Sequence, residues 1–236
     1  MSSFILKIIA LITMTIDHFS IIILRKPAGF LRVIGRIAFP LFAFQLVQGF
    51  IHTKNRLKHC TLLLIFAFIS QVPFELAFNI KSLNIFFTLF LGFVAIWLFE
   101  FTYNSLKSYI KNHNKILYII SLIVILPFAF LGNIYNVDYG AWGILVICLF
   151  YFTRNCKKFI IPLLGYAALC IFKYWNVLLK APLNINVWLN LLGTFIPIVL
   201  IYFYNGRKGK SMKYLFYIYY PAHLILLHYL ATFFII

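Results

Sequence analysis

The stretch FILKIIALITMTIDHFSIIIL, residues 4–24, decides the fold of this chain. It is long enough to cross a bilayer as a helix, which takes about 20 apolar residues. Lys7, Asp17 and His18 lie inside it, although a charged group in a membrane span costs about 3 kcal/mol on insertion scales. About 16 Å of helix rise separates Lys7 from His18, so Lys7 reaches one membrane surface while His18 lies deep. The stretch therefore predicts a membrane helix with a functional polar face.

The next apolar run, FLRVIGRIAFPLFAFQLVQGF at residues 30–50, carries two arginines. Arg32 and Arg36 are four residues apart and share one helix face. A short connection makes the two helices antiparallel neighbours, which brings Asp17 close as a counter-charge. We expect Asp17, His18, Arg32 and Arg36 to form one buried polar cluster between the first two spans, with a functional role.

Composition indicates an all-α, polytopic membrane helix bundle, organised as a single domain over residues 1–236. Of the 236 residues, 64% are hydrophobic and 20% aromatic, and the mean hydropathy is +0.98. Separate runs of about 20 apolar residues favour helices over a barrel, whose strands would alternate in polarity. The net charge is +17. In a membrane protein, that excess indicates basic cytoplasmic loops and contact with anionic lipid, so the expected partner is the bilayer and not nucleic acid.

The apolar runs predict about nine spans, with eight and ten as the alternatives. They are 4–24, 30–51, 60–78, 84–103, 116–132, 139–153, 159–175, 186–204 and 213–235. Thirteen of the 21 Lys and Arg residues fall into alternate connections. They are Lys54, Arg56, Lys58, Lys107, Lys111, Lys115, Arg154, Lys157, Lys158, Arg207, Lys208, Lys210 and Lys213. The positive-inside rule then predicts a cytoplasmic-membrane protein whose N-terminus lies inside and whose C-terminus lies outside.

This topology puts further polar residues on the outer side, with the predicted cluster. Glu75, at the end of the third span, is a candidate to orient an acceptor, and Asn84 begins the fourth span nearby. In the last span Tyr220 and His223 share a helix face, so His223 is a second candidate acid or base. We expect Asp138 to cap the sixth span.

For the remaining polar residues we expect structural roles. No spacing of His, Cys or carboxylate residues predicts a metal site. Gln45, Gln48, Gln71 and Ser70 are expected to hydrogen-bond between helices. No P-loop, dinucleotide fingerprint or GxSxG elbow is present in the sequence.

Several blocks resemble a known family. They are KIIALITMTIDH at 7–18, LRVIGRIAFPLFAFQLVQGFIHTKNRLKH at 31–59, IFAFISQVPFELAFN at 65–79, NIFFTLFLG at 84–92, YGAWGILVICLFYFTRN at 139–155 and YYPAHLILL at 219–227. This pattern resembles the TraX family of integral membrane proteins, named after the conjugal-transfer protein that acetylates the N-terminus of F-type pilin. The chain is more distantly similar to multi-span acyltransferases with an Arg and a His in their first span. Lys7 stands in the place of that Arg, and His18 in the place of the His.

The resemblance implies an acetyl-CoA-dependent transferase that modifies an amine or hydroxyl at the outer face, on a pilin-like protein, a peptide or a glycan. His18 would act as base and Arg36 or Arg32 would stabilise the oxyanion. Substrate would be bound by Lys7, Glu75, Asn84 and Tyr220. The CoA phosphates would meet Arg207 and Lys208, with neighbouring Lys210. Two alternatives remain, a transporter or channel with a buried ionic pathway and a non-catalytic assembly subunit of a surface or conjugation apparatus.

Overall fold

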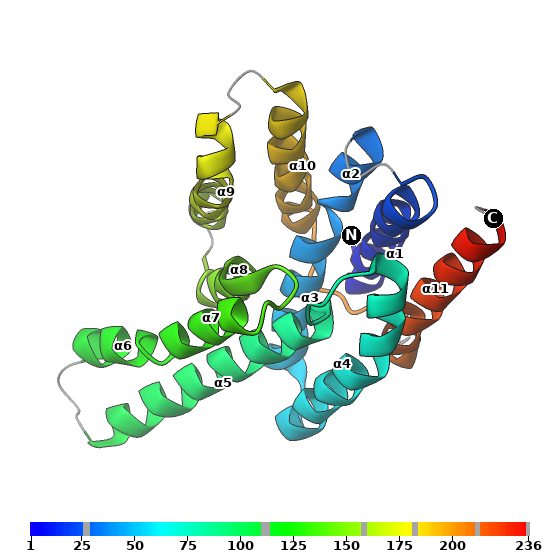
Figure 1. Cartoon of the computed structure of the whole chain (residues 1–236). Coiled ribbons are helices and arrows are strands. Elements are labelled where there is room, and N and C mark those ends of the chain that lie inside the picture. Colours follow the sequence, from blue (N-terminus) through cyan, green and yellow to red (C-terminus); the bar gives the residue numbers. More distant parts are fainter. Residues whose placement is uncertain (26–28, 110–113, 157–159, 181–183, 211–212, 235–236) are drawn as a thin grey trace.

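The computed structural model describes residues 1–25, 29–109, 114–156, 160–180, 184–210 and 213–234. Within these residues the fold is all-helical, as predicted, with a single isolated β-bridge between Leu83 and Val137. The helices, labelled in Figure 1, are α1 (Ser3–Ile22), α2 (Phe30–Gly35), α3 (Ala38–His52), α4 (Arg56–Phe78), α5 (Ile85–Tyr109), α6 (Asn114–Leu122), α7 (Ile125–Ile134), α8 (Gly140–Phe152), α9 (Ile160–Lys180), α10 (Ile185–Tyr202) and α11 (Lys213–Phe234).

The helices support a membrane protein, whereas the predicted count of nine crossings stays a prediction. Six helical stretches among the described residues are long and apolar enough to cross a membrane. They are Ser3–Ile22, Phe30–His52, Arg56–Phe78, Ile85–Ser108, Ile116–Ile134 and Ile185–Tyr202. Two shorter apolar helical stretches, Gly140–Phe152 and Ile161–Trp175, also lie within predicted spans.

Two predicted spans are each made of two helices, and a proline explains both breaks. The span at 30–51 divides between α2 and α3, and the span at 116–132 divides between α6 and α7. Proline has no N–H to donate to the carbonyl four residues earlier. Pro40 therefore cannot donate to the carbonyl of Arg36, and Pro127 cannot donate to that of Ile123. The Ile123 carbonyl accepts instead from the N–H of Leu126, three residues later. Each helix break falls at that earlier residue.

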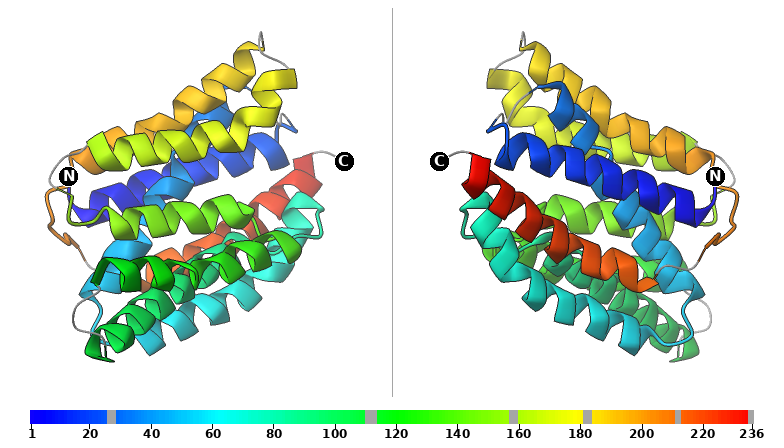
Figure 2. Two further views of the ribbon diagram at one scale, coloured as in Figure 1. Left: turned by 90° about the vertical axis from the view of Figure 1, so that its left-hand side faces the viewer. Right: turned by 90° about the vertical axis from the view of Figure 1, so that its right-hand side faces the viewer.

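Most helices run along one common direction, and the two ends of the chain lie at opposite ends of the bundle (Figure 2). The connection between α10 and α11 lies beside the N-terminus, because the backbone N–H of Ser3 donates to the carbonyl of Arg207. At the other end, the connection before α5 bonds to the one before α8, where Leu83 N–H donates to the carbonyl of Asn136. The orientation of these ends across a membrane stays a prediction.

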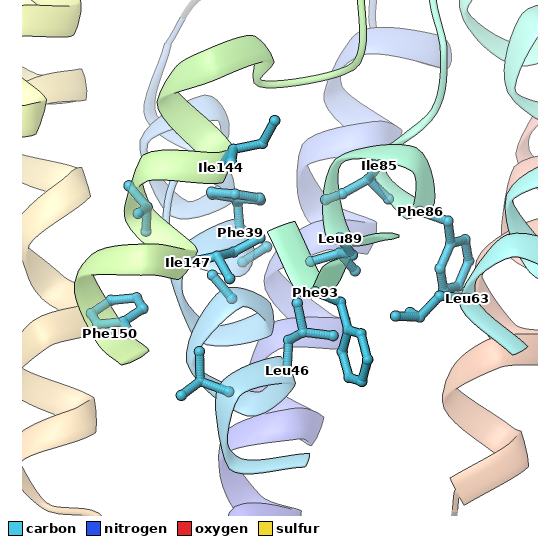
Figure 3. Close-up of a cluster of buried hydrophobic side chains, with 14 of the residues drawn as sticks. Phe39, Leu46, Leu63, Ile85, Phe86, Leu89, Phe93, Ile144, Ile147 and Phe150 are labelled. Carbon is cyan, nitrogen blue, oxygen red and sulfur yellow. The ribbon is translucent and has the colours of Figure 1, made fainter. Parts of the chain in front are cut away.

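The core lies where α3, α4, α5 and α8 meet (Figure 3). Phe93, Ile144 and Ile147 are completely buried there. Large apolar side chains also face outward, among them Phe68, which is 65% exposed, and Phe172, which is 77% exposed. Such exposure would be costly in water and suits contact with lipid. The bundle thus buries a core and presents an apolar outer surface.

Candidate functional site

The centre of the candidate site is a pair of histidines from the first and last helices. Nδ1 of His18, on α1, lies 2.8 Å from Nε2 of His223, on α11. The two rings are nearly parallel, with centroids 5.0 Å apart. His223 is 5% exposed and His18 is partly buried. We call His18 and His223 the histidine pair.

The hydrogen bonds of the histidine pair define its proton positions. Nδ1 of His223 lies 2.9 Å from the backbone carbonyl of Tyr219, which can only accept, so this nitrogen carries a proton. In a neutral imidazole Nε2 of His223 is then an acceptor, and Nδ1 of His18 must be the donor in the bond between the rings. His18 therefore presents an unprotonated Nε2, which is the form that a general base requires.

Aromatic side chains surround the pair. The ring of Phe78 meets His18 edge-on at 5.0 Å, and Tyr220 lies 6.3 Å from it. Tyr219 stacks on His223 at 5.1 Å. The hydroxyl of Thr15 donates to the carbonyl of Leu11, so the Tyr219 hydroxyl is the donor in its 2.7 Å bond to Thr15. These contacts fix the histidine rings in a mostly apolar environment, where water competes little for a proton.

The expected single cluster is divided in two, because Asp17 and His18 face different neighbours. Adjacent helical residues point about 100° apart. Asp17 faces α2, where its Oδ2 accepts from Nη1 of Arg32 at 2.6 Å, and the two side chains are 14% and 17% exposed. Arg36 lies nearby, and its Nε donates to Oδ1 of Asn190 on α10 at 3.3 Å. We call Asp17, Arg32, Arg36 and Asn190 the ion-pair cluster.

The close approach of α1 and α2 at this ion pair depends on a glycine. A Cβ added to Gly35 would overlap the carboxylate of Asp17 and would lie 2.5 Å from its Cβ. Only glycine therefore lets α2 come near enough for Arg32 to reach Asp17. α1, which carries His18, packs against α2, α3 and α11.

The structure adds Asp138 and Lys173 to the polar residues near the ion-pair cluster, and sequence reasoning missed both roles. The predicted cap was wrong, since α8 begins after Tyr139, which serves as its N-cap. Nζ of Lys173 lies 4.0 Å from the Trp142 ring and 4.9 Å from that of Tyr139. Burial raises the pKa of Asp138 to about 6, and the positive charge of Lys173 opposes this rise. The signal in the sequence was a lysine within an apolar run.

A cavity of about 480 Å³ leads from the N-terminal end of the bundle toward the histidine pair. Its mouth carries Lys54, Lys208 and Lys210, and no acidic side chain lines the part that the structure describes. Its interior is mainly apolar, with Leu11, Met14, Leu46, Leu63, Ile85, Phe86, Leu89, Tyr217 and Tyr220. Tyr220 connects the two features, because it lines the cavity and its ring lies 5.5 Å from His223.

The remaining predicted substrate residues occupy different places. Lys7 lines the cavity, with its Nζ 5.1 Å from the Phe216 ring centroid. Arg207 is an exposed neighbour of the mouth and does not line the cavity.

Two predicted substrate residues at the opposite end of the bundle bond within the protein. Glu75 is exposed and accepts from the Gln71 amide at 2.7 Å. Asn84 is fully buried, and its amide donates to Ala67 and Gln71 and accepts from the N–H of Phe86. In this structure Asn84 directly precedes α5 and does not line the cavity. No three His, Cys, Asp or Glu side chains converge as a metal site among the described residues.

Comparisons with known proteins found one family and one relative that match this chain. The chain matches the TraX protein family over residues 2–231. It is also similar to a probable fimbrial assembly protein, FimC of serogroup H1, from Dichelobacter nodosus. The two sequences are 31% identical over 252 residues, which cover 96% of this chain and 94% of the relative. No solved structure matches the chain.

Proposed function

This chain belongs to the TraX family, and on that basis we propose that it is a membrane-embedded acetyltransferase. It takes an acetyl group from cytoplasmic acetyl-CoA and delivers it to an amine or hydroxyl at the outer face. The observation that carries the proposal is the 2.8 Å bond within the histidine pair, beside the inner end of the cavity. That bond supports an unprotonated Nε2 on His18, which transfer to an amine or hydroxyl needs.

The cavity suits the donor. Lys54, Lys208 and Lys210 at its mouth provide positive charge for the phosphates of CoA, and no carboxylate opposes them along the described lining. The mainly apolar interior suits the uncharged arm that ends in the thioester. Tyr220 at the inner end then lies next to the acetyl group and near both histidines.

The reaction follows from these positions. The acceptor nitrogen or oxygen attacks the acetyl carbonyl carbon, and Nε2 of His18 takes the proton that the acceptor loses. The tetrahedral intermediate then collapses, the carbon–sulfur bond breaks, and CoA leaves after its sulfur receives that proton. The bond from Nδ1 of His18 to His223 keeps the ring in the required tautomer.

Tyr220 and the ion-pair cluster have supporting roles. The Tyr220 hydroxyl lies beside the backbone N–H of Ile85, and we assign the hydroxyl proton to the developing oxyanion. Arg32 is engaged with Asp17, so we assign this pair to positioning α1. Arg36 remains the candidate to hold the acceptor or to stabilise charge from the other side.

The proposal is tested in membranes that contain the wild-type chain or His18→Ala, supplied with labelled acetyl-CoA and membranes of the native host as acceptors. We expect CoA release and a labelled acceptor with the wild type, and a loss of about 100-fold or more in the variant. His228→Ala is the matched control, because His228 lies on α11 and contacts Tyr229 instead of the pair. Equal labelling in all three membranes would refute a catalytic role for His18.

A second candidate is a non-catalytic subunit of a surface assembly apparatus. The similarity to a probable fimbrial assembly protein from Dichelobacter nodosus favours this candidate. This candidate predicts that surface fibres disappear when the chain is deleted and return fully with His18→Ala. The acetyltransferase predicts that His18→Ala fails to restore whatever depends on the modified acceptor.

A further inference from the structure

The cavity follows one face of α1 and ends before it reaches the histidine pair. The α1 side chains that line it are Phe4, Lys7, Leu11 and Met14, at successive spacings of three, four and three residues. This spacing keeps to one helix face, and the next residue on that face is His18. His18 does not belong to the described lining. Met14 is therefore the last residue of α1 along the cavity, about 6 Å of helix rise before His18.

The last helix shows the same pattern. α11 contributes Phe216, Tyr217 and Tyr220 to the lining, and His223, three residues after Tyr220, lies outside the part that the structure describes. Met14 and Tyr220 are 5% and 4% exposed, whereas the lysines at the mouth are exposed. Met14 and Tyr220 therefore form the inner end of the cavity, between its apolar interior and the histidine pair.

The two residues at the inner end differ in what they can contribute. The Tyr220 ring lies between two aromatic neighbours, 5.3 Å from Phe86 and 6.3 Å from His18, and its hydroxyl is already assigned to the oxyanion. Met14 has no proton to give to the reaction. Its unbranched thioether side chain has three rotatable bonds and fills irregular apolar space. The property that Met14 brings to the cavity end is therefore its bulk.

The acyl group of the donor must reach this inner end. The proposed reaction requires the acetyl carbonyl carbon near Nε2 of His18, and CoA enters from the mouth, so the thioester lies beside Met14 and Tyr220. The sulfur and the alkyl group are both bonded to the carbonyl carbon. With the sulfur toward the mouth, the alkyl group continues toward the end wall. A methyl group needs little room there, whereas each further methylene would extend into the side chain of Met14.

We propose that Met14 limits the acyl group to acetyl, because it closes the inner end of the donor cavity to longer chains. This inference rests on the proposed function, since it takes an acyl-CoA as the donor. The reaction is the same for any chain length. The acceptor attacks the thioester carbonyl carbon, the carbon–sulfur bond breaks, and CoA leaves with the proton that the acceptor lost. Met14 is a specificity residue in this account and takes no part in proton transfer.

The test compares acetyl-CoA with propionyl-CoA, each labelled in the acyl group, as donors for the full-length chain in membranes that hold the native acceptors. The measured quantity is the ratio of the two initial rates within one preparation, which does not depend on how much of the protein is folded. Met14→Ala removes most of the side chain, and Met14→Leu keeps its volume. The matched control is Leu11→Ala, which widens the cavity on the same helix face, one turn nearer the mouth.

One added methylene in an apolar site changes the rate by about 10- to 200-fold, so we expect the wild type to prefer acetyl-CoA over propionyl-CoA within that range. Met14→Ala should reduce this preference about 10-fold, whereas Met14→Leu and Leu11→Ala should keep it. An unchanged ratio in Met14→Ala would overturn the inference. An equal fall in Leu11→Ala would also overturn it, since that result indicates a general loosening of the cavity.

A folding defect and a failure of the proposed function give different results. If Met14→Ala does not fold, Met14→Val should change the ratio less and in the same direction, and an unchanged ratio there would overturn the inference. If the wild type transfers neither acyl group, the donor itself is wrong and the role of Met14 falls with it. If the wild type transfers both groups equally fast, acyl transfer stands and only the role of Met14 is lost.

Discussion

Nδ1 of His18 lies 2.8 Å from Nε2 of His223, a residue 205 positions later in the chain. This bond joins the first helix to the last. The carbonyl of Tyr219 accepts from Nδ1 of His223, which leaves Nε2 of His223 as the acceptor for His18. Neither histidine has a carboxylate partner among the described residues, since Asp17 is paired with Arg32. The orientation of the base therefore depends on a second imidazole.

Replacing His223 tests this arrangement. His223→Ala removes the acceptor for Nδ1 of His18, so we expect acetyl transfer to fall by about 10- to 100-fold. His223→Gln places an amide oxygen near the position of Nε2, and should recover part of that activity. Initial rates of labelled acetyl transfer provide the measurement. Identical rates in the Ala and Gln variants would show that His18 does not need an acceptor at this position.

Variants of Asp17 and Arg32 test whether this ion pair positions α1. Either Asp17→Asn or Arg32→Gln leaves one partly buried charge without its partner, which should lower the free energy of unfolding by about 3 kcal/mol. The double variant removes both charges of the pair and should recover part of that loss. Thermal unfolding of the four proteins makes a double-mutant cycle. Strictly additive losses would argue against the pair as the link between α1 and α2.

The variant Gly35→Ala tests the close approach of α2 to α1 at Asp17. Gly35→Ala would push a methyl group into Asp17, so we expect it to destabilise the chain by about 2 kcal/mol and to lower activity by displacing α1. Gly165→Ala is the matched control on α9, because its methyl group would meet only the flexible side chain of Leu149, whose Cδ1 would lie at 2.7 Å, and Gly165 does not line the cavity. Similar melting temperatures for Gly35→Ala and the wild type would contradict the tight approach.

Because the pKa of Asp138 is raised in the folded chain, we expect the stability of the chain to depend on pH. Burial raises its pKa from an ordinary 3.8 to about 6, against the opposing charge of Lys173. Between these two values the folded chain keeps a proton that the unfolded chain releases, so this group makes stability fall as pH rises toward 6. Asp138→Asn should lack this contribution. Melting temperatures of both chains across that range check it, and parallel curves would rule it out.

The sequence was sufficient for the local features of the fold. Long apolar runs predicted helices because backbone groups in lipid must bond within their own segment. The short connection after α1 correctly brought Arg32 to Asp17. The breaks near Arg36 and Ile123 were missed, four residues before Pro40 and Pro127. Proline alone was not a sufficient signal, because Pro73, Pro197 and Pro221 lie inside unbroken helices.

The candidate site was less accessible to sequence reasoning, because its contacts join distant helices. His18 and His223 were each singled out as ionisable groups in apolar runs, but no spacing rule links residues 205 positions apart. Gln45 was expected to bond between helices, and it does so through Ser3. The positions of Asn190 and Lys173 near the ion-pair cluster depend on how α9 and α10 pack.

The most direct test of the central claim is a sided transfer reaction. The purified chain is reconstituted into vesicles with labelled acetyl-CoA on the face that exposes Lys208 and Lys210, and an amine-bearing acceptor peptide on the other. Our account predicts labelled acceptor with the wild type and background labelling with His18→Ala. If His18→Ala labels the acceptor as fast as the wild type, or if the folded wild type transfers nothing to any native acceptor, His18-dependent acetyl transfer is contradicted.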